Sequence, residues 1–152
     1  MFRGANLLNL DAKGRLAIPG RYRDELAERC SGHLVVTVNN ASERCLWMYP
    51  LDEWRRVEEK VVALPAFDRN HQKLKRFFLG YAGDVEMDKS GRVLLPAPLR
   101  EFATMTREIY LIGQGNKFEL WSGELWTTRR DQWLEEDIDM DKISVEMEQL
   151  SL

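Results

Sequence analysis

The sequence has few residues that could cross-link the fold or bind a metal. Its 152 residues include two cysteines, Cys30 and Cys45, and two histidines, His33 and His71. A disulfide framework or a four-ligand zinc site needs more of these residues, and the histidines are not at ligand spacing. We therefore expect a reduced protein with no metal site and no cofactor.

The chain also lacks a long apolar run. Its longest uncharged stretches, such as residues 34–38, have the length of a strand, whereas a helix that spans a bilayer needs about 20 apolar residues. Residues 1–6 contain no extended apolar segment of the kind found in a signal peptide. We expect a soluble, cytoplasmic protein with no membrane partner. Its 44% of hydrophobic residues suffice for one sizeable core or two small ones.

Signatures of catalysis are missing as well. The sequence contains no glycine-rich phosphate loop, no His-Glu-x-x-His and no Gly-x-Ser-x-Gly. Two aspartates, Asp11 and Asp88, recur in equivalent places, but turn formation accounts for them and no third group accompanies them. We therefore expect the protein not to be an enzyme and to have no small-molecule substrate.

The net charge of −3 conceals two regions of opposite sign. Residues 131–152 contain eight acids and one base, a net charge of −7, and the first 130 residues contain 21 bases and 17 acids, a net charge of +4. Residues 1–23 carry five bases and one acid, and residues 69–76 carry four bases and no acid. A basic body with an acidic tail is compatible with a polyanionic partner, although an ordinary solvated surface also explains the charge alone.

An internal repeat relates residues 10–23 to residues 87–100 at a constant offset of 77. Each copy of the repeat continues into an apolar strand, an aromatic strand and a helix that carries a tryptophan. Because a unit of roughly 45–50 residues is too small for a secure core of its own, we expect the two copies to share one core. The copies read Leu10-Asp11-Ala12-Lys13-Gly14-Arg15-Leu16-Ala17-Ile18-Pro19-Gly20-Arg21-Tyr22-Arg23 and Met87-Asp88-Lys89-Ser90-Gly91-Arg92-Val93-Leu94-Leu95-Pro96-Ala97-Pro98-Leu99-Arg100.

One copy predicts the element order β-β-α-β-β. In the motif Asp11-x-x-Gly14, the aspartate can accept hydrogen bonds from the backbone that follows it, and the glycine accepts a positive φ. These residues predict a hairpin with a glycine bulge between two short strands. Pro19 suits the first turn of a helix, which Ser31-Gly32 would end. The strands are predicted at residues 5–10, 15–18, 34–38 and 45–49, and the apolar face of the helix at Tyr22, Leu26 and Cys30.

Amphipathic helices are predicted between and after the copies. The expected ranges are 51–62 and 70–79, which bridge the copies, and 124–137, whose apolar residues are Leu125, Trp126, Trp133 and Leu134. Beyond Asp137 the acidic tail has little to bury, which favours a mobile segment. Its Ile143, Met147 and Leu150 also fall at helical spacing, so a short docking helix is the alternative.

Two arginines, Arg15 and Arg92, directly follow the turn glycines. One interpretation is an exposed ion pair with Asp11 or Asp88, a contact that contributes about 0–1 kcal/mol. The other is that paired hairpins present the guanidinium groups to phosphates or guanine edges, which their planar donors suit. A two-stranded ribbon fits the major groove of DNA. Further basic residues that could join this surface are Lys13 and Lys89, within the turns, and Arg3, before the first strand.

The repeated motif resembles the duplicated signature of the MraZ family. The matching residues are Asp11, Gly14, Arg15, Pro19 and Arg23, repeated as Asp88, Gly91, Arg92, Pro96 and Arg100, with the opening Met1-Phe2-Arg3-Gly4 and the run Gly115-Asn116-Lys117-Phe118-Glu119-Leu120-Trp121. The resemblance covers about residues 1–135. It implies a β-rich α+β fold, in which two β-β-α-β-β swapped-hairpin half-modules of the AbrB/MazE/SpoVT type form one β-barrel. The implied divisions are a first module at 5–52, a helical bridge at 53–80, a second module at 81–124, a C-terminal helix at 125–137 and an acidic tail at 138–152.

The same resemblance implies a sequence-specific, nucleoid-associated transcriptional regulator of the bacterial division and cell-wall gene cluster. Such a protein binds promoter repeats in double-stranded DNA as a ring-shaped homo-oligomer through its hairpin arginines. The candidate DNA-binding residues are Arg15, Lys13, Arg3, Arg92 and Lys89, and the turn-structural residues are Asp11, Gly14, Asp88 and Gly91.

Two questions stay open at the level of the sequence. The second turn differs from the first in its central residues, Lys89-Ser90 in place of Ala12-Lys13. Both hairpins could contact DNA, or the second could face the ring interior or a subunit contact. The alternative function is an assembly or interaction module whose ring is itself the product. A projecting turn that carries both Lys13 and Arg15 favours DNA binding, because a pure scaffold has no need of this charge.

Overall fold

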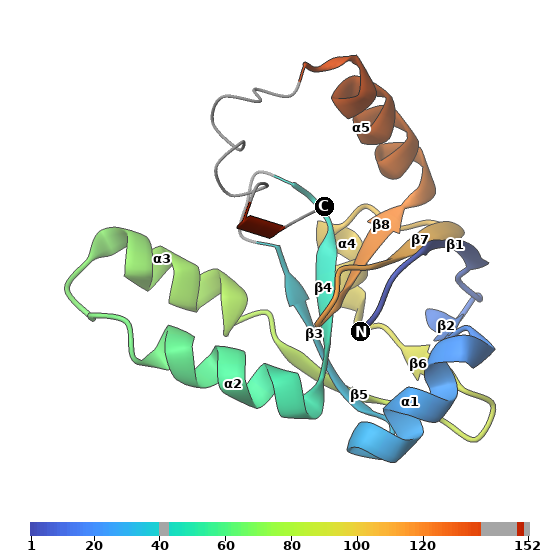
Figure 1. The fold of residues 1–152 in the computed structure, drawn as a ribbon, viewed down its shortest axis with the longest axis horizontal. Helices are drawn as coiled ribbons and strands as arrows, with labels where there is room; N and C mark the ends of the chain where they lie inside the picture. The colour runs from blue at the N-terminus through green and yellow to red at the C-terminus, as the bar shows by residue number, and fades with distance from the viewer. Residues whose placement is uncertain (40–42, 138–148, 151–152) are drawn as a thin grey trace.

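The computed structural model describes residues 1–39, 43–137 and 149–150, and these residues form an α+β fold (Figure 1). In chain order the elements are β1 (Ala5–Asn9), β2 (Arg15–Ala17), α1 (Gly20–Cys30), β3 (His33–Val38), β4 (Leu46–Pro50), α2 (Leu51–Val62), α3 (Arg69–Phe78), β5 (Gly83–Glu86), β6 (Arg92–Leu94), α4 (Ala97–Phe102), β7 (Glu108–Gly113), β8 (Phe118–Ser122) and α5 (Gly123–Glu135). The predicted order β-β-α-β-β is therefore found twice, with α2 and α3 as the bridge and α5 at the end. The predicted acidic tail and its alternative docking helix lie outside the described residues, except for Gln149 and Leu150.

Six strands form one antiparallel sheet in the order β1-β7-β8-β4-β3-β5, and β2 pairs with β6 in a separate two-stranded ribbon. The two copies of the repeat are interleaved, because β1 of the first copy pairs with β7 of the second, and β5 of the second pairs with β3 of the first. The ladder predicted between the two arms of each hairpin is therefore wrong, since both arms pair with the other copy. Among the described residues the ladder does not close into a barrel, because β1 and β5 are the edges of the sheet.

The two copies share one hydrophobic core, as the size of the repeat predicts. Leu16 and Val93 of the ribbon are fully buried and belong to the same cluster as Met48, Phe118 and Leu120 of the large sheet. The buried members of this cluster include residues of β2 to β8, and Leu8 of β1 is partly buried against them. Burial of apolar surface on this scale is the dominant stabilising term in folding. The core is therefore built by both copies together.

Helices cover the other side of the large sheet in two places. Trp54 of α2 and Phe78 of α3 pack against Val35 and Tyr49, and α5 packs on β7 and β8 through Trp126, which contacts Trp121. In Figure 1 the α2–α3 pair extends to the left of the sheet, and the β2–β6 ribbon lies on its right. The bridge helices and the ribbon are therefore on different sides of the molecule.

The predicted helix boundaries are confirmed by the local geometry. Pro19 precedes α1, and the helix ends where Ser31 and Gly32 adopt positive φ values of 54° and 76°. Their amide groups donate to the carbonyl oxygens of Ala27 and Leu26, which satisfies two carbonyl groups of the last turn. One predicted apolar contact is not made, because Leu134 near the end of α5 is 77% exposed.

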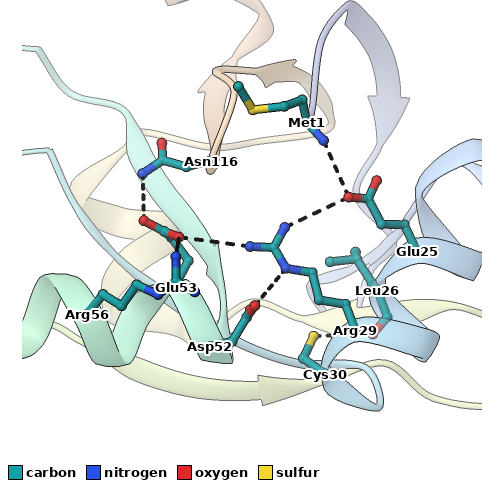
Figure 2. A network of polar contacts seen from close by, with 9 residues as sticks. All are labelled: Met1, Glu25, Leu26, Arg29, Cys30, Asp52, Glu53, Arg56 and Asn116. Carbon is teal, nitrogen blue, oxygen red and sulfur yellow. Dashed lines mark hydrogen bonds and ion pairs between the residues drawn. The ribbon is translucent and has the colours of Figure 1, made fainter.

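A polar network centred on Arg29 joins the N-terminal segment, α1, α2 and the β7–β8 turn (Figure 2). Arg29 Nε donates to Asp52 (2.7 Å), and its terminal nitrogens lie 3.8 Å from Glu25 and 3.9 Å from Glu53. Asn116 donates to Glu53 (3.1 Å). The hydrogen bond that Arg29 donates to Asp52 raises the pKa of Arg29. Burial by itself would raise the pKa of Asp52, but the Arg29 guanidinium outweighs it, so the pKa of Asp52 is lowered.

Neither cysteine is part of a disulfide. Cys45 is buried, and burial raises the pKa of its thiol, while Cys30 is half-buried and its Sγ lies 3.2 Å from the Leu26 carbonyl oxygen. Within the described ranges, no three His, Cys, Asp or Glu side chains gather as a metal site. In the same part of the chain, no helix combines the length and apolar character needed to cross a membrane.

Candidate nucleic-acid interface

The turn between β1 and β2 is organised by one aspartate. The Asp11 carbonyl accepts from Gly14 N–H (3.0 Å), and Asp11 N–H donates to the Arg15 carbonyl (2.9 Å). The Asp11 carboxylate accepts two further backbone bonds, from Lys13 N–H (3.0 Å) and Arg15 N–H (2.8 Å). Gly14 has a φ of +87°, which is the conformation that favours glycine. The tight turn that ends at a glycine is therefore confirmed. The two strands that it joins, β1 and β2, do not pair with each other.

The turn between β5 and β6 repeats this geometry. The Asp88 carbonyl accepts from Gly91 N–H (2.9 Å), and the Asp88 carboxylate accepts from Ser90 N–H (2.8 Å) and Arg92 N–H (3.0 Å). Gly91 has a φ of +73°. The exchange of Ala12-Lys13 for Lys89-Ser90 therefore leaves the shape of the turn unchanged.

Hydrogen bonds to the ionised carboxylates lower the pKa of both turn aspartates. For Asp11 the largest contribution is the backbone bond from Arg15, and for Asp88 it is the backbone bond from Arg92. A carboxylate that accepts several N–H bonds is stabilised in its charged form. Both turns therefore contain a fixed negative charge beside the arginine that follows.

Each turn arginine is paired with its own aspartate through one nitrogen. Arg15 Nε donates to Asp11 Oδ2 (2.7 Å), and Arg92 Nε donates to Asp88 Oδ2 (3.0 Å). The ion pair expected in the simpler interpretation is thus present. It occupies only Nε, and in the described part of the chain neither guanidinium makes another hydrogen bond through Nη1 or Nη2. The side chains are 30% and 36% exposed, so the end-on donor pairs remain accessible.

The ribbon brings the two arginines to one face. Its register pairs Arg15 with Leu94, Leu16 with Val93, and Ala17 with Arg92. Because side chains alternate along a strand, the burial of Leu16 and Val93 directs the other residues outward. Arg15 and Arg92 therefore lie diagonally on the outer face, with Leu94, 55% exposed, opposite Arg15 and with Ala17 opposite Arg92. We call this surface the ribbon face; it consists of Arg15, Ala17, Arg92 and Leu94.

Two more arginines stabilise this arrangement, and sequence reasoning did not assign them a role. Arg100 packs on Gly14, where an added Cβ would lie 2.6 Å from its Cζ, and Arg23 packs on Gly91, where a Cβ would lie 2.4 Å from its Nε. Each copy thus covers the turn of the other copy. The repeat is the feature of the sequence that could have indicated a role for them, because Arg23 and Arg100 are the equivalent last residues of its two copies.

Main-chain bonds hold these two arginines and the two turns in place. Arg23 Nε donates to the Ile18 carbonyl (2.5 Å), and Arg100 Nε donates to the Leu95 carbonyl (3.0 Å). Ile18 and Leu95 also join the two copies through their own amides. Ile18 N–H donates to the Gly91 carbonyl and Leu95 N–H donates to the Gly14 carbonyl, both at 2.9 Å. The ribbon and its turns therefore form one unit with contributions from both halves of the chain.

The remaining predicted residues fall in two places. Lys13 and Lys89 are exposed within the turns, next to the ribbon face. Arg3 is exposed at the opposite end of β1 from its own turn, and its carbonyl accepts from the Tyr22 hydroxyl (2.5 Å). The neighbouring Gly4 packs against Arg21 of α1. Arg3 thus lies beside the first turn of α1 rather than at the hairpin that β1 enters.

Comparisons with known proteins place this geometry in a family. A family model described as MraZ protein matches the chain twice, over residues 1–77 and 78–145. A protein of Halorhodospira halophila named transcriptional regulator MraZ is 50% identical, and one of Thioalkalivibrio sulfidiphilus with the same name is 47% identical, each over all of both chains. A Pseudomonas entomophila protein of that name is 52% identical over 83% of each chain. The match spans both copies of the repeat, and the chain belongs to the MraZ family.

Proposed function

We propose that this protein is a sequence-specific DNA-binding transcriptional regulator that contacts promoter DNA with the ribbon face. The observation that carries the proposal is the placement of Arg15 and Arg92, one from each copy, on one outward surface with their end-on donor pairs accessible. The relatives named transcriptional regulators support the regulatory role. An enzyme is disfavoured, since the relatives carry no enzyme name.

The proposed contact uses the two edges of the guanidinium group differently. Asp11 and Asp88 hold Nε of the following arginine and so limit the orientations of its side chain. Nη1 and Nη2 then face outward as a fork that can bond the O6 and N7 atoms of a guanine or straddle a phosphate. An antiparallel ribbon fits the major groove, which is about 12 Å wide.

The basic residues around the ribbon face supply affinity that does not depend on sequence. Lys13 and Lys89 in the exposed turns are placed to contact phosphates on either side of the groove. Arg3, beside α1, would contact the backbone farther along the duplex. The fixed charges of Asp11 and Asp88 oppose these cations locally, so the net attraction comes from the lysines and the arginines together.

Because the two turns have the same geometry, we propose that both contact DNA. The finer parts of the proposal follow the resemblance to the MraZ family. Modules 5–52 and 81–124 build a barrel, joined by the bridge 53–80 and followed by the helix 125–137 and the acidic tail 138–152. The protein forms a ring-shaped homo-oligomer. Its target is the promoter repeats of the division and cell-wall gene cluster, which it binds in the cytoplasm as a nucleoid-associated protein. Several weak ribbon contacts on successive repeats would add up in such a ring.

The test is fluorescence anisotropy with a labelled duplex from the promoter of the division and cell-wall gene cluster and a shuffled duplex of equal length, each at two salt concentrations. We expect tighter binding to the promoter, and affinity for both duplexes that falls as salt rises. Lys13→Ala should weaken binding to both duplexes and flatten the salt dependence. Equal and weak binding of the two duplexes would support the alternative, an assembly module that does not read DNA.

A further inference from the structure

A groove beside α3 is lined by three aromatic rings. It lies between α3, the end of α4 and the segment before β4, and its volume is about 780 Å³. Phe77 stacks on Tyr81 with ring centroids 6.1 Å apart, and Tyr81 contacts Phe102 at 5.7 Å. The Arg44 guanidinium lies 4.9 Å above the Phe102 ring. We call this the bridge groove; it is lined by Arg44, His71, Lys73, Phe77, Tyr81 and Phe102.

Two cations line the bridge groove, Lys73 of α3 and Arg44, which precedes β4. Residues 69–76 of α3 contain four bases and no acid, and three of these bases, Arg69, Lys73 and Arg76, are exposed. Glu43 also lines the groove, but its carboxylate is bound to Arg129 of α5. The groove therefore combines aromatic surface with the cations Lys73 and Arg44 and lies beside a basic helix, which fits a segment that combines apolar and acidic side chains.

The end of α5 has the complementary character. Residues 133–137 read Trp-Leu-Glu-Glu-Asp, with three acids and no base. Leu134 is 77% exposed and Trp133 is 37% exposed. We call residues 133–137 the α5 tip. An exposed leucine beside an exposed tryptophan at the end of a helix is a surface that a partner would bury.

The α5 tip does not fill the groove of its own chain. α5 is fixed on β7 and β8 by Trp126, which contacts Trp121 and Tyr110, and Arg129 holds it to Glu43 at the groove rim. In this position the tip leaves Leu134 uncovered. Among the described residues no segment of the chain therefore covers Leu134 or occupies the groove with acidic side chains, and a second copy carries a segment of the required chemistry.

We propose that the α5 tip of one copy docks in the bridge groove of the next copy, with Leu134 on the aromatic rings and Glu135 and Glu136 against Lys73 and Arg69. This inference rests on the homo-oligomer in the proposed function and assigns the surfaces that build it. The two surfaces are different parts of the chain, so the contact is heterologous and continues from copy to copy until the rotation closes a ring.

Two charge-reversed variants test the contact in the full-length chain. The groove variant carries Arg69→Glu with Lys73→Glu, and the tip variant carries Glu135→Lys with Glu136→Lys. Glu at position 69 and Lys at positions 135 and 136 suit the local helix ends. Position 73 is exposed within α3, so we expect unchanged circular dichroism for both variants. Their matched controls reverse exposed charges on α2, with Arg55→Glu and Lys60→Glu for the first, and Glu58→Lys and Glu59→Lys for the second.

The measurement is the mass by light scattering at micromolar concentration. We expect the wild type and both controls to have a multiple of the 17.8 kDa chain mass, and each reversed variant alone to have a lower mass. An equimolar mixture of the two variants should recover the wild-type mass, because each reversed surface then meets its complement. Such recovery requires that groove and tip act between copies.

Other outcomes separate the possible errors. A wild-type monomer would contradict the homo-oligomer itself, and with it this contact. An oligomer that keeps its mass in both variants would overturn the docking proposal and leave the homo-oligomer intact. A groove variant of unchanged mass that loses affinity for a shuffled duplex would assign the groove to nucleic acid instead. Loss of mass only after removal of residues 138–152 would assign it to that segment.

Discussion

At each turn of the ribbon, a single aspartate shapes the loop and orients the arginine that follows. The Asp11 carboxylate accepts from the backbone of Lys13 and Arg15 and from the Arg15 side chain. The ion pair and the proposed DNA contact are therefore compatible, since they use different edges of one guanidinium. An exposed pair of this kind adds little to stability, which agrees with a role in positioning.

The turn aspartates should titrate at unusually low pH. The pKa of Asp11 and of Asp88 lies below the ordinary 3.8, chiefly because backbone N–H groups of Arg15 and Arg92 bond the ionised form. A depressed folded-state pKa contributes stability above the unfolded pKa, which is lost as the pH falls through the folded value. NMR titration of the side-chain carboxyl carbons, assigned with Asp11→Asn and Asp88→Asn, measures both values. Titration at or above 3.8 would contradict the hydrogen bonding described here.

Residue roles in the turns follow from the sequence only in part. The motif Asp-x-x-Gly predicts both the aspartate bonds and the positive φ of the glycine, because these depend on four adjacent residues. The packing of Arg100 on Gly14 and of Arg23 on Gly91 joins residues far apart in the chain. The repeat marks these arginines as equivalent, but no local pattern states which residue each one contacts.

At the scale of elements, the turn glycines control the ribbon. We expect Gly14→Ala and Gly91→Ala each to destabilise the fold by about 1–3 kcal/mol, because alanine is strained at a positive φ. The new Cβ would also displace the guanidinium of Arg100 or Arg23. Urea unfolding measures the effect. Gly20→Ala is the control, since its Cβ meets open space at the start of α1 and should leave stability unchanged or higher by up to about 1 kcal/mol. Equal stability of all three variants would show that the turns tolerate alanine.

The helices are the elements that the sequence predicts best. Pro19 and Pro96 precede α1 and α4 as expected, and the ranges predicted for α2 and α3 agree with the structure to within one residue. These features depend on local capping and on one apolar face. The end of α5 differs, because its pattern includes Leu134, which is 77% exposed. Periodicity identifies an apolar face without identifying what covers it.

At the scale of the whole molecule, the exchange of strands decides the fold. β1 pairs with β7 and β5 with β3, so each copy completes the sheet of the other. The five residues of β1, Ala-Asn-Leu-Leu-Asn, show no strict apolar alternation that would select β7 over β2 as a partner. The tight turn after β1 favours the nearer partner, β2. The local pattern therefore predicts where each strand lies but does not predict which strands pair with each other. The resemblance to a family implies both the swapped topology and a closed barrel. The observed ladder contains the strand exchange, but among the described residues it does not close into a barrel.

Strand exchange makes the two halves dependent on each other. We expect fragments 1–66 and 67–152, cut in the exposed turn between α2 and α3, to lack cooperative unfolding when purified separately. Mixed after unfolding, they should regain it, because β1 again finds β7 and β5 again finds β3. Thermal unfolding followed by circular dichroism measures each sample. Cooperative unfolding of either fragment alone would mean that each copy has an adequate core of its own.

The central claim is that both copies present one arginine each to DNA on a single ribbon face. Its most direct test is the Kd for promoter DNA of Arg15→Ala, Arg92→Ala and the double variant, with Arg55→Ala on α2 as the control and circular dichroism to confirm each fold. Each ribbon variant should lose affinity by a similar factor, about 5- to 150-fold for a lost bidentate contact, and Arg55→Ala should bind like the wild type. A folded Arg92→Ala variant with wild-type affinity would restrict the contact to the first turn. Wild-type affinity in the double variant would contradict the ribbon face as the DNA-binding surface.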